Sequence, residues 1–78
     1  MKQKYDFNRL INNIYYLGKI NDIPIAKLEK DIGLSKGYFY RNKIATKPHS
    51  IGIETVIAVA EYFSTDMERL LFEDLSKK

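Results

Sequence analysis

The sequence predicts an all-α domain of five helices. Three observations carry this prediction: apolar residues recur at spacings of three and four, residues typical of helix ends separate these segments, and no segment shows a strand pattern. The 78 residues include no cysteine, so we expect a core built by helix packing without disulfides. We expect a single domain over residues 1–78, with a core over about 5–72 and a frayed C-terminal tail.

The first expected helix begins at Phe7 and has the apolar spacing of an amphipathic helix. Its apolar residues are Phe7, Leu10, Ile11, Ile14 and Leu17. We expect Gly18 to end this helix, because glycine readily adopts the left-handed conformation that closes many helices. Proline favours the start of a helix, so a second, short helix is expected to open at Pro24. Its apolar residues are Ile25, Leu28 and Ile32.

A tight turn is expected to follow the second helix. Gly33 can adopt a left-handed conformation there, and Ser35 is a good N-cap for a third helix. That third helix is predicted over residues 35–43, because residues 46–50 lack apolar periodicity and the residue before Pro48 is biased to extended geometry. A helix, a tight turn and a helix are thus expected between residues 24 and 43.

Two more helices are expected in the C-terminal third. The fourth helix is expected after Gly52, and its apolar residues are Ile53, Val56, Ile57, Ala60 and Phe63. The residue types at Thr65 and Glu68 form a capping box for a short fifth helix, in which a serine or threonine and an acid three positions later satisfy the first backbone N–H groups. The fifth helix carries Met67, Leu70 and Leu71.

The segment IAKLEKDIGLSKGYFYR, residues 25–41, resembles the helix-turn-helix of the Cro and phage-repressor family, also called the XRE family. The matching residues are Leu28, Ile32, Gly33, Leu34, Ser35 and Phe39. The segment IETVIAVAEYFSTDMERL resembles the family's two closing helices. The resemblance covers most of the chain and implies a lambda-repressor-like fold, with the second helix across the DNA backbone and the third in the major groove.

Two positions depart from the family pattern. Glu29 stands where the family usually has a small residue, so we expect either a splayed helix pair or a Glu29 side chain that swings outward. Asn42 stands where a second apolar residue of the recognition helix normally packs. We expect Ile44 to fold back and supply the missing apolar contact.

Charge is distributed unevenly along the chain. Residues 1–49 contain ten lysines and arginines and four acids, which gives a formal charge of +6. Residues 50–78 contain three lysines and arginines and six acids, which gives a formal charge of −3. Four cations and no acid lie between Lys36 and Lys47. Such a segment favours a polyanionic partner, although each of these cations by itself is more often a solvated side chain.

If Phe39 points into the core, the opposite face of the third helix points outward. The resemblance implies that residues on this outward face contact DNA bases. The implied base-contact residues are Lys36, Gly37, Tyr40 and Arg41. The expected phosphate-contact residues are Ser35, Tyr38, Lys43, Lys47, His49 and Ser50. The alternative for Tyr38 and Tyr40 is that their rings only pack against the core while their hydroxyl groups remain in water. For Tyr38, this alternative and a DNA contact are equally favoured.

These observations favour a sequence-specific transcriptional regulator, expected to be a repressor, that binds double-stranded DNA as a homodimer. A dimer interface is expected on the last helix, with the alternative that the same residues close the core: Met67, Leu70, Leu71 and Phe72. The alternative function is a protein-interaction module, such as an antitoxin or anti-regulator subunit. Its support is the aromatic third helix and the acidic, apolar C-terminal end.

Other classes of protein are not favoured. Phosphate-binding loops, metal-ligand spacings and catalytic pairings are missing, so we expect no enzyme, cofactor, metal or small-molecule ligand. The longest apolar stretch, Val56 to Ala60, is too short to cross a bilayer, and the first residues do not have the apolar region of a signal peptide. We expect a cytoplasmic protein.

Overall fold

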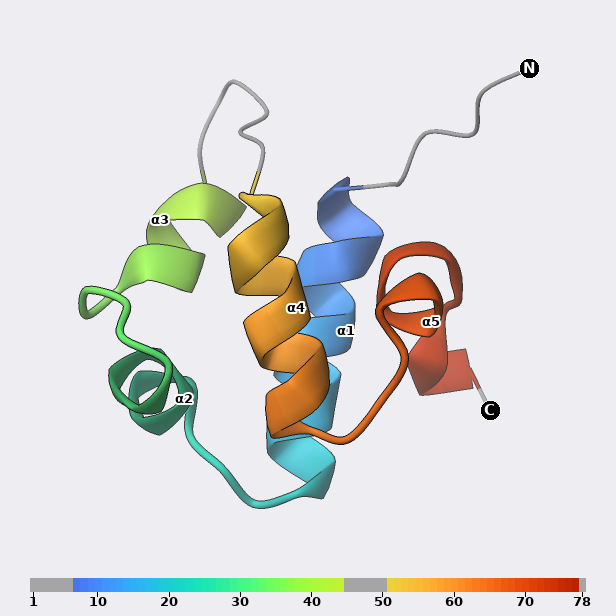
Figure 1. Cartoon of the computed structure of the whole chain (residues 1–78), viewed down its shortest axis with the longest axis horizontal. Coiled ribbons are helices and arrows are strands. Elements are labelled where there is room, and N and C mark those ends of the chain that lie inside the picture. Colours follow the sequence, from blue (N-terminus) through green and yellow to red (C-terminus); the bar gives the residue numbers. More distant parts are fainter. Residues whose placement is uncertain (1–6, 45–50, 78) are drawn as a thin grey trace.

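The computed structural model describes residues 7–44 and 51–77, and these contain five α-helices, one 3₁₀ helix and no strand (Figure 1). The elements are α1 (Phe7–Ile20), α2 (Ile25–Asp31), α3 (Tyr38–Lys43), α4 (Ile53–Tyr62), α5 (Met67–Phe72) and η1 (Leu75–Lys77). Over the described residues, the prediction of an all-α fold with five helices is confirmed. None of the described helices has the length and apolarity needed to cross a membrane.

The longest helix, α1, organises the fold because it contacts α2, α3, α5 and η1. Figure 1 shows α2 and α3 on one side of α1 and α5 on the other. The buried apolar side chains come from all of these elements, from α4 and from Ile51, which precedes α4: Leu10, Ile11, Ile14, Leu17, Leu28, Phe39, Ile51, Val56, Val59, Ala60, Leu70 and Leu75. The α2–α3 pair and the C-terminal segment are thus attached to different sides of one long helix.

The end of α1 differs from the prediction, because the helix continues through Gly18 to Ile20. It closes at Asp22, which has a left-handed φ of 59°, and the backbone N–H of Ile23 donates to the Gly18 carbonyl at 2.8 Å. A Cβ atom at Gly18 would lie 2.8 Å from the Ile23 carbonyl oxygen. Gly18 is therefore needed for a close backbone approach, and the prediction that it ends the helix is wrong.

The fourth and fifth helices also differ from the prediction in detail. Ile53 and Ile57 belong to the apolar spacing that predicted the fourth helix, but 57% and 41% of their surfaces are exposed. The buried residues of α4 are Val56, Val59 and Ala60, so the buried face is centred away from the two isoleucines. The capping box is wrong as well: α5 is preceded by Asp66 as N-cap, without a side-chain cap hydrogen bond.

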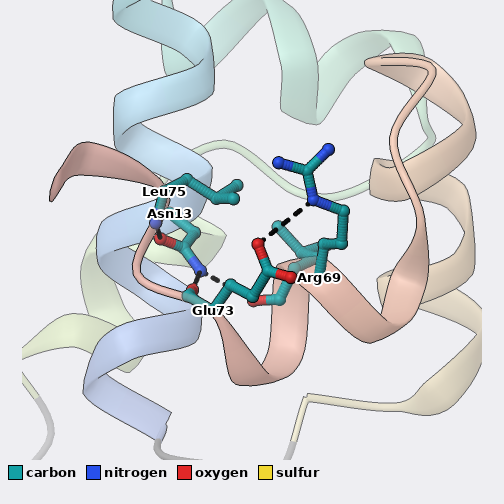
Figure 2. A network of polar contacts seen from close by, with 5 residues as sticks. Asn13, Arg69, Glu73 and Leu75 are labelled. Atoms are coloured by element: carbon teal, nitrogen blue, oxygen red, sulfur yellow. Dashed lines mark hydrogen bonds and ion pairs between the residues drawn. The ribbon is translucent and has the colours of Figure 1, made fainter. Parts of the chain in front are cut away.

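A buried amide that the sequence analysis missed attaches the C-terminal segment to α1 (Figure 2). Asn13 Nδ2 donates to the carbonyl oxygens of Leu70 at 2.8 Å and Glu73 at 2.6 Å, and Asn13 Oδ1 accepts from the Leu75 N–H at 3.0 Å. Leu75 is only 5% exposed, so the core extends beyond residue 72. The expectation that the tail is frayed from that point is wrong for Leu75.

A cluster on the surface joins α4 to α2. The Tyr62 hydroxyl donates to Asp31 Oδ2 at 2.6 Å, and Lys27 Nζ donates to the same oxygen at 3.0 Å. These hydrogen bonds, first from Tyr62 and then from Lys27, hold the pKa of Asp31 below its usual value. The hydrogen bond to Asp31 raises the pKa of Tyr62, because it stabilises the protonated hydroxyl.

Candidate nucleic-acid interface

The chain reverses tightly between α2 and α3 at Gly33. Gly33 has a φ of +87°, the Leu34 N–H donates to the Glu29 carbonyl at 2.7 Å, and the Gly33 N–H donates to the Lys30 carbonyl at 3.3 Å. These two hydrogen bonds form a Schellman motif, which satisfies carbonyls at the end of α2. The prediction that Gly33 is left-handed is confirmed.

The Glu29 side chain connects the two helices from within the protein. It is 1% exposed, and its carboxylate accepts the backbone N–H groups of Gly37 and Phe39, each at 2.9 Å. The first N–H groups of a helix have no partner inside the helix, so a carboxylate is well suited to this place. The expectation that Glu29 could swing outward is therefore wrong.

The start of α3 is also later than predicted. Residues 35–37 form a turn in which the Tyr38 N–H donates to the Ser35 carbonyl at 3.1 Å, and Gly37 is the N-cap residue, with a φ of 83°. Ser35 is not the N-cap, and a predicted recognition helix over 35–43 is shortened to Tyr38–Lys43. The physical reason is that Glu29, from another helix, supplies the acceptor that Ser35 was expected to supply.

The α3 helix has one buried and one exposed face. Phe39 is fully buried, and Tyr38 packs edge-on against it with ring centroids 5.2 Å apart. Tyr40 is 58% exposed, and Lys36 and Arg41 are exposed beside it. Of the four implied base-contact residues, the structure thus places three on the surface, while Gly37 is half-buried.

The expected phosphate-contact residues are more dispersed. Ser35 is exposed in the turn, Tyr38 is half-buried against the core, and Lys43 Nζ lies 4.6 Å from the centroid of the Tyr15 ring on α1. Burial raises the pKa of Tyr15, and the charge of Glu29 adds to this shift. Lys47, His49 and Ser50 lie outside the described residues.

The end of α3 corrects one further expectation. Ile44 does not fold back onto the core, because 58% of its surface is exposed. The Asn42 side chain instead donates to the Tyr38 carbonyl one turn earlier, at 2.8 Å. The Asn42 amide group thus finds a hydrogen-bond partner within its own helix. This position therefore does not require an apolar contact from Ile44.

A surface hollow next to the turn adds a cation that the sequence analysis did not assign to the site. The hollow is open, has a volume of about 600 Å³, and is lined by Ala26, Lys30, Gly33, Leu34 and Lys36. Lys30 and Lys36 come from different elements, α2 and the turn. The turn at Gly33 brings them to the same hollow, which spacing along the sequence did not reveal.

The expected dimer residues on α5 are partly used by the chain itself. Leu70 is fully buried, so the expectation that it contributes to a dimer surface is wrong. Met67, Leu71 and Phe72 are half-buried. The alternative, in which these residues close the core, therefore holds for Leu70.

Comparison with family models, curated proteins and solved structures finds no match for this chain. Within residues 7–44 and 51–77, no group of three or more histidines, cysteines and acids is placed to hold a metal ion.

Proposed function

We propose that this chain is a sequence-specific transcriptional regulator that binds double-stranded DNA with α3 in the major groove. The observation that carries the proposal is the exposed surface formed by Lys36, Tyr40 and Arg41, on the opposite side of α3 from the buried Phe39. No acidic residue occurs from position 32 to position 53. A cationic surface with hydrogen-bond donors and one exposed ring suits both the phosphates and the base edges of a duplex.

The anchoring of α3 supports this function. Six residues make a helix about 9 Å long, too short to be stable alone. Here the Glu29 carboxylate holds its first N–H groups and Phe39 fills the core. A helix held in this way loses little conformational entropy when it enters a groove, so more of the contact energy contributes to binding.

Lys43 is the described residue best placed to add a phosphate contact. Its ammonium group lies over the Tyr15 ring and is exposed, which limits its motion without neutralising its charge. Contacts of this kind strengthen binding to any duplex and contribute no base preference.

We further propose that the protein acts in the cytoplasm. We also propose that it binds as a homodimer, because one six-residue helix contacts few base pairs. Met67, Leu71 and Phe72 on α5 remain partly accessible for such a contact. Two copies related by a two-fold axis would bind half-sites about one helical turn apart. Sedimentation of the protein with and without duplex tests this part; a single copy on every duplex would contradict it.

The DNA-binding proposal is tested by fluorescence anisotropy with a random-sequence duplex at about 50 and 200 mM salt. We expect affinity to fall steeply with salt, because bound cations release counterions from the phosphates. Lys36→Ala should lower the slope of log affinity against log salt by about one ion. The matched control is Lys19→Ala, because Lys19 is an exposed lysine in the last turn of α1. Figure 1 shows this end of α1 and the helix α3 at opposite ends of the view.

Two outcomes would contradict the proposal. The first is a folded protein that binds no duplex at the lower salt concentration. The second is an equal change in slope for the Lys36 and Lys19 variants, which would show that binding depends on net charge alone. The first outcome would favour the alternative that the exposed side of α3 binds another protein.

A further inference from the structure

The guanidinium group of Arg41 is exposed but held in place by its own chain. Arg41 Nη1 donates to the Lys36 carbonyl at 2.8 Å, and Arg41 Nη2 donates to Ser35 Oγ at 2.8 Å. Both acceptors belong to the turn that precedes α3. The side chain therefore folds back over the start of its own helix.

Gly37 provides the space for this arrangement. A Cβ atom at Gly37 would lie 3.0 Å from Arg41 Nη1, and the φ of +83° is itself unfavourable for other residues. The buried side of the same segment is held by Glu29, whose carboxylate accepts the Gly37 N–H. The turn under Arg41 is thus supported from the core, and its position relative to α3 is well defined.

The two internal hydrogen bonds leave part of the guanidinium group available. Arginine has five N–H groups, of which the turn occupies one on each Nη atom. The Nε–H and the remaining Nη protons can still form a paired contact with two acceptors. Guanine presents such a pair, O6 and N7, at the edge of its ring in the major groove.

We propose that Ser35 is a positioning residue that determines specificity: its hydroxyl, together with the Lys36 carbonyl, orients the Arg41 guanidinium for a paired contact with guanine. This inference rests on the proposed DNA-binding function. It assigns Ser35 a role different from the phosphate contact expected from the sequence. An arginine that is already oriented loses less rotamer freedom on binding than one that moves freely in solvent.

The test uses a duplex selected by the wild-type protein from a randomised library, and a random duplex of equal length. Arg41→Ala should lower affinity for the selected duplex by about 10- to 100-fold and for the random duplex much less. Ser35→Ala should lower affinity for the selected duplex by about 3- to 10-fold, and should have no further effect when Arg41 is already alanine. Ser35→Thr retains the hydroxyl and should stay within about 2-fold of the wild type.

A measurement without DNA tests the internal contact by itself. In nuclear magnetic resonance spectra, the Arg41 side-chain N–H signals should exchange more slowly with solvent in the wild type than in Ser35→Ala. Equal exchange rates would overturn the orienting role whether or not DNA binds. Thermal melts of each variant confirm that the fold is intact.

The outcomes separate the two proposals. If Ser35→Ala leaves the affinity for the selected duplex unchanged, or weakens selected and random duplexes equally, the inference is overturned while DNA binding stands. An additive effect of Ser35→Ala and Arg41→Ala would overturn it too. If the wild type binds no duplex, DNA binding fails, and the specificity role of Ser35 fails with it.

Discussion

Two short helices on different sides of α1 depend on one buried polar side chain each, and the chemistry of the two side chains differs. Glu29 accepts two backbone N–H groups at the start of α3. Asn13 donates to two backbone carbonyls at and just beyond the end of α5 and accepts the N–H of Leu75. A carboxylate can only accept, whereas an amide can do both.

The difference follows from what each helix end presents. The start of a helix has unpaired N–H groups and the positive end of the dipole, so an anion is favourable. The end of a helix presents carbonyls, which would repel an anion. Since the helices α3 and α5 have six residues each, both require support from another element. An isosteric exchange of acid and amide at each site tests this explanation.

The largest effect is expected for Asn13→Asp. A carboxylate at this buried site loses both donors and faces two carbonyl oxygens, so we expect the free energy of unfolding to fall by about 3 kcal/mol or more at neutral pH. Urea unfolding measures the change. Asn12→Asp, at an exposed neighbouring position, is the matched control and should have little effect.

The same variant has a predictable pH dependence. Surrounding carbonyls raise the pKa of the new carboxyl group in the folded protein above its unfolded value, so protonation favours folding. The stability lost at neutral pH should therefore be partly recovered as the pH falls through that raised pKa. A difference between Asn13→Asp and Asn12→Asp that does not change with pH would contradict the explanation by charge.

A smaller loss is expected for Glu29→Gln. The amide oxygen can still accept one backbone N–H, but the amide nitrogen faces the other, so one buried donor is left without a partner at a cost of about 1 to 3 kcal/mol. Amide hydrogen exchange at Gly37 and Phe39 should become faster. Glu68→Gln, an exposed acid in the first turn of α5, serves as control, and equal unfolding midpoints for the two variants would contradict the role of Glu29.

Helix ends that are closed locally provide a third case. The ends of α2 and α4 carry the same two hydrogen bonds, with Gly33 and Ser64 in the left-handed position, and Ser64 has a φ of 54°. Because a side chain disfavours this conformation, Ser64→Gly should raise the free energy of unfolding by about 0.5 to 1 kcal/mol, and Gly33→Ala should lower it by a similar amount. Melting temperatures of Ser64→Gly and Gly33→Ala that change in the same direction would contradict this interpretation.

The smallest effect is expected at the exposed cluster of Tyr62, Asp31 and Lys27. Because the pKa of Asp31 is lowered in the fold, its contribution to stability is present above the unfolded pKa and is lost as the pH falls through the folded value. Tyr62→Phe should make stability less dependent on pH in acid, with little change near neutrality, since exposed pairs contribute little. An unchanged acid profile would show that this contact between α2 and α4 is unimportant in solution.

Much of the architecture depends on local patterns and was predictable. The apolar spacing predicted five helices, Pro24 marked the start of α2, and Gly33 marked the turn, because each depends on residues within a few positions along the chain. The outward position of Tyr40 followed from the inward position of Phe39 in the same way.

The tertiary structure decided what local spacing does not contain. Glu29 replaced Ser35 as the acceptor for the start of α3, and it did so from another helix. Asn13, which the sequence analysis missed, contacts backbone groups 57 to 62 residues away. Its spacing of three from Leu10 and four from Leu17 was the signal that could have placed it on the apolar side of α1. A buried polar group must find a partner, but the sequence around it does not say which distant backbone will supply that partner, because only the packing of the helices brings the two together.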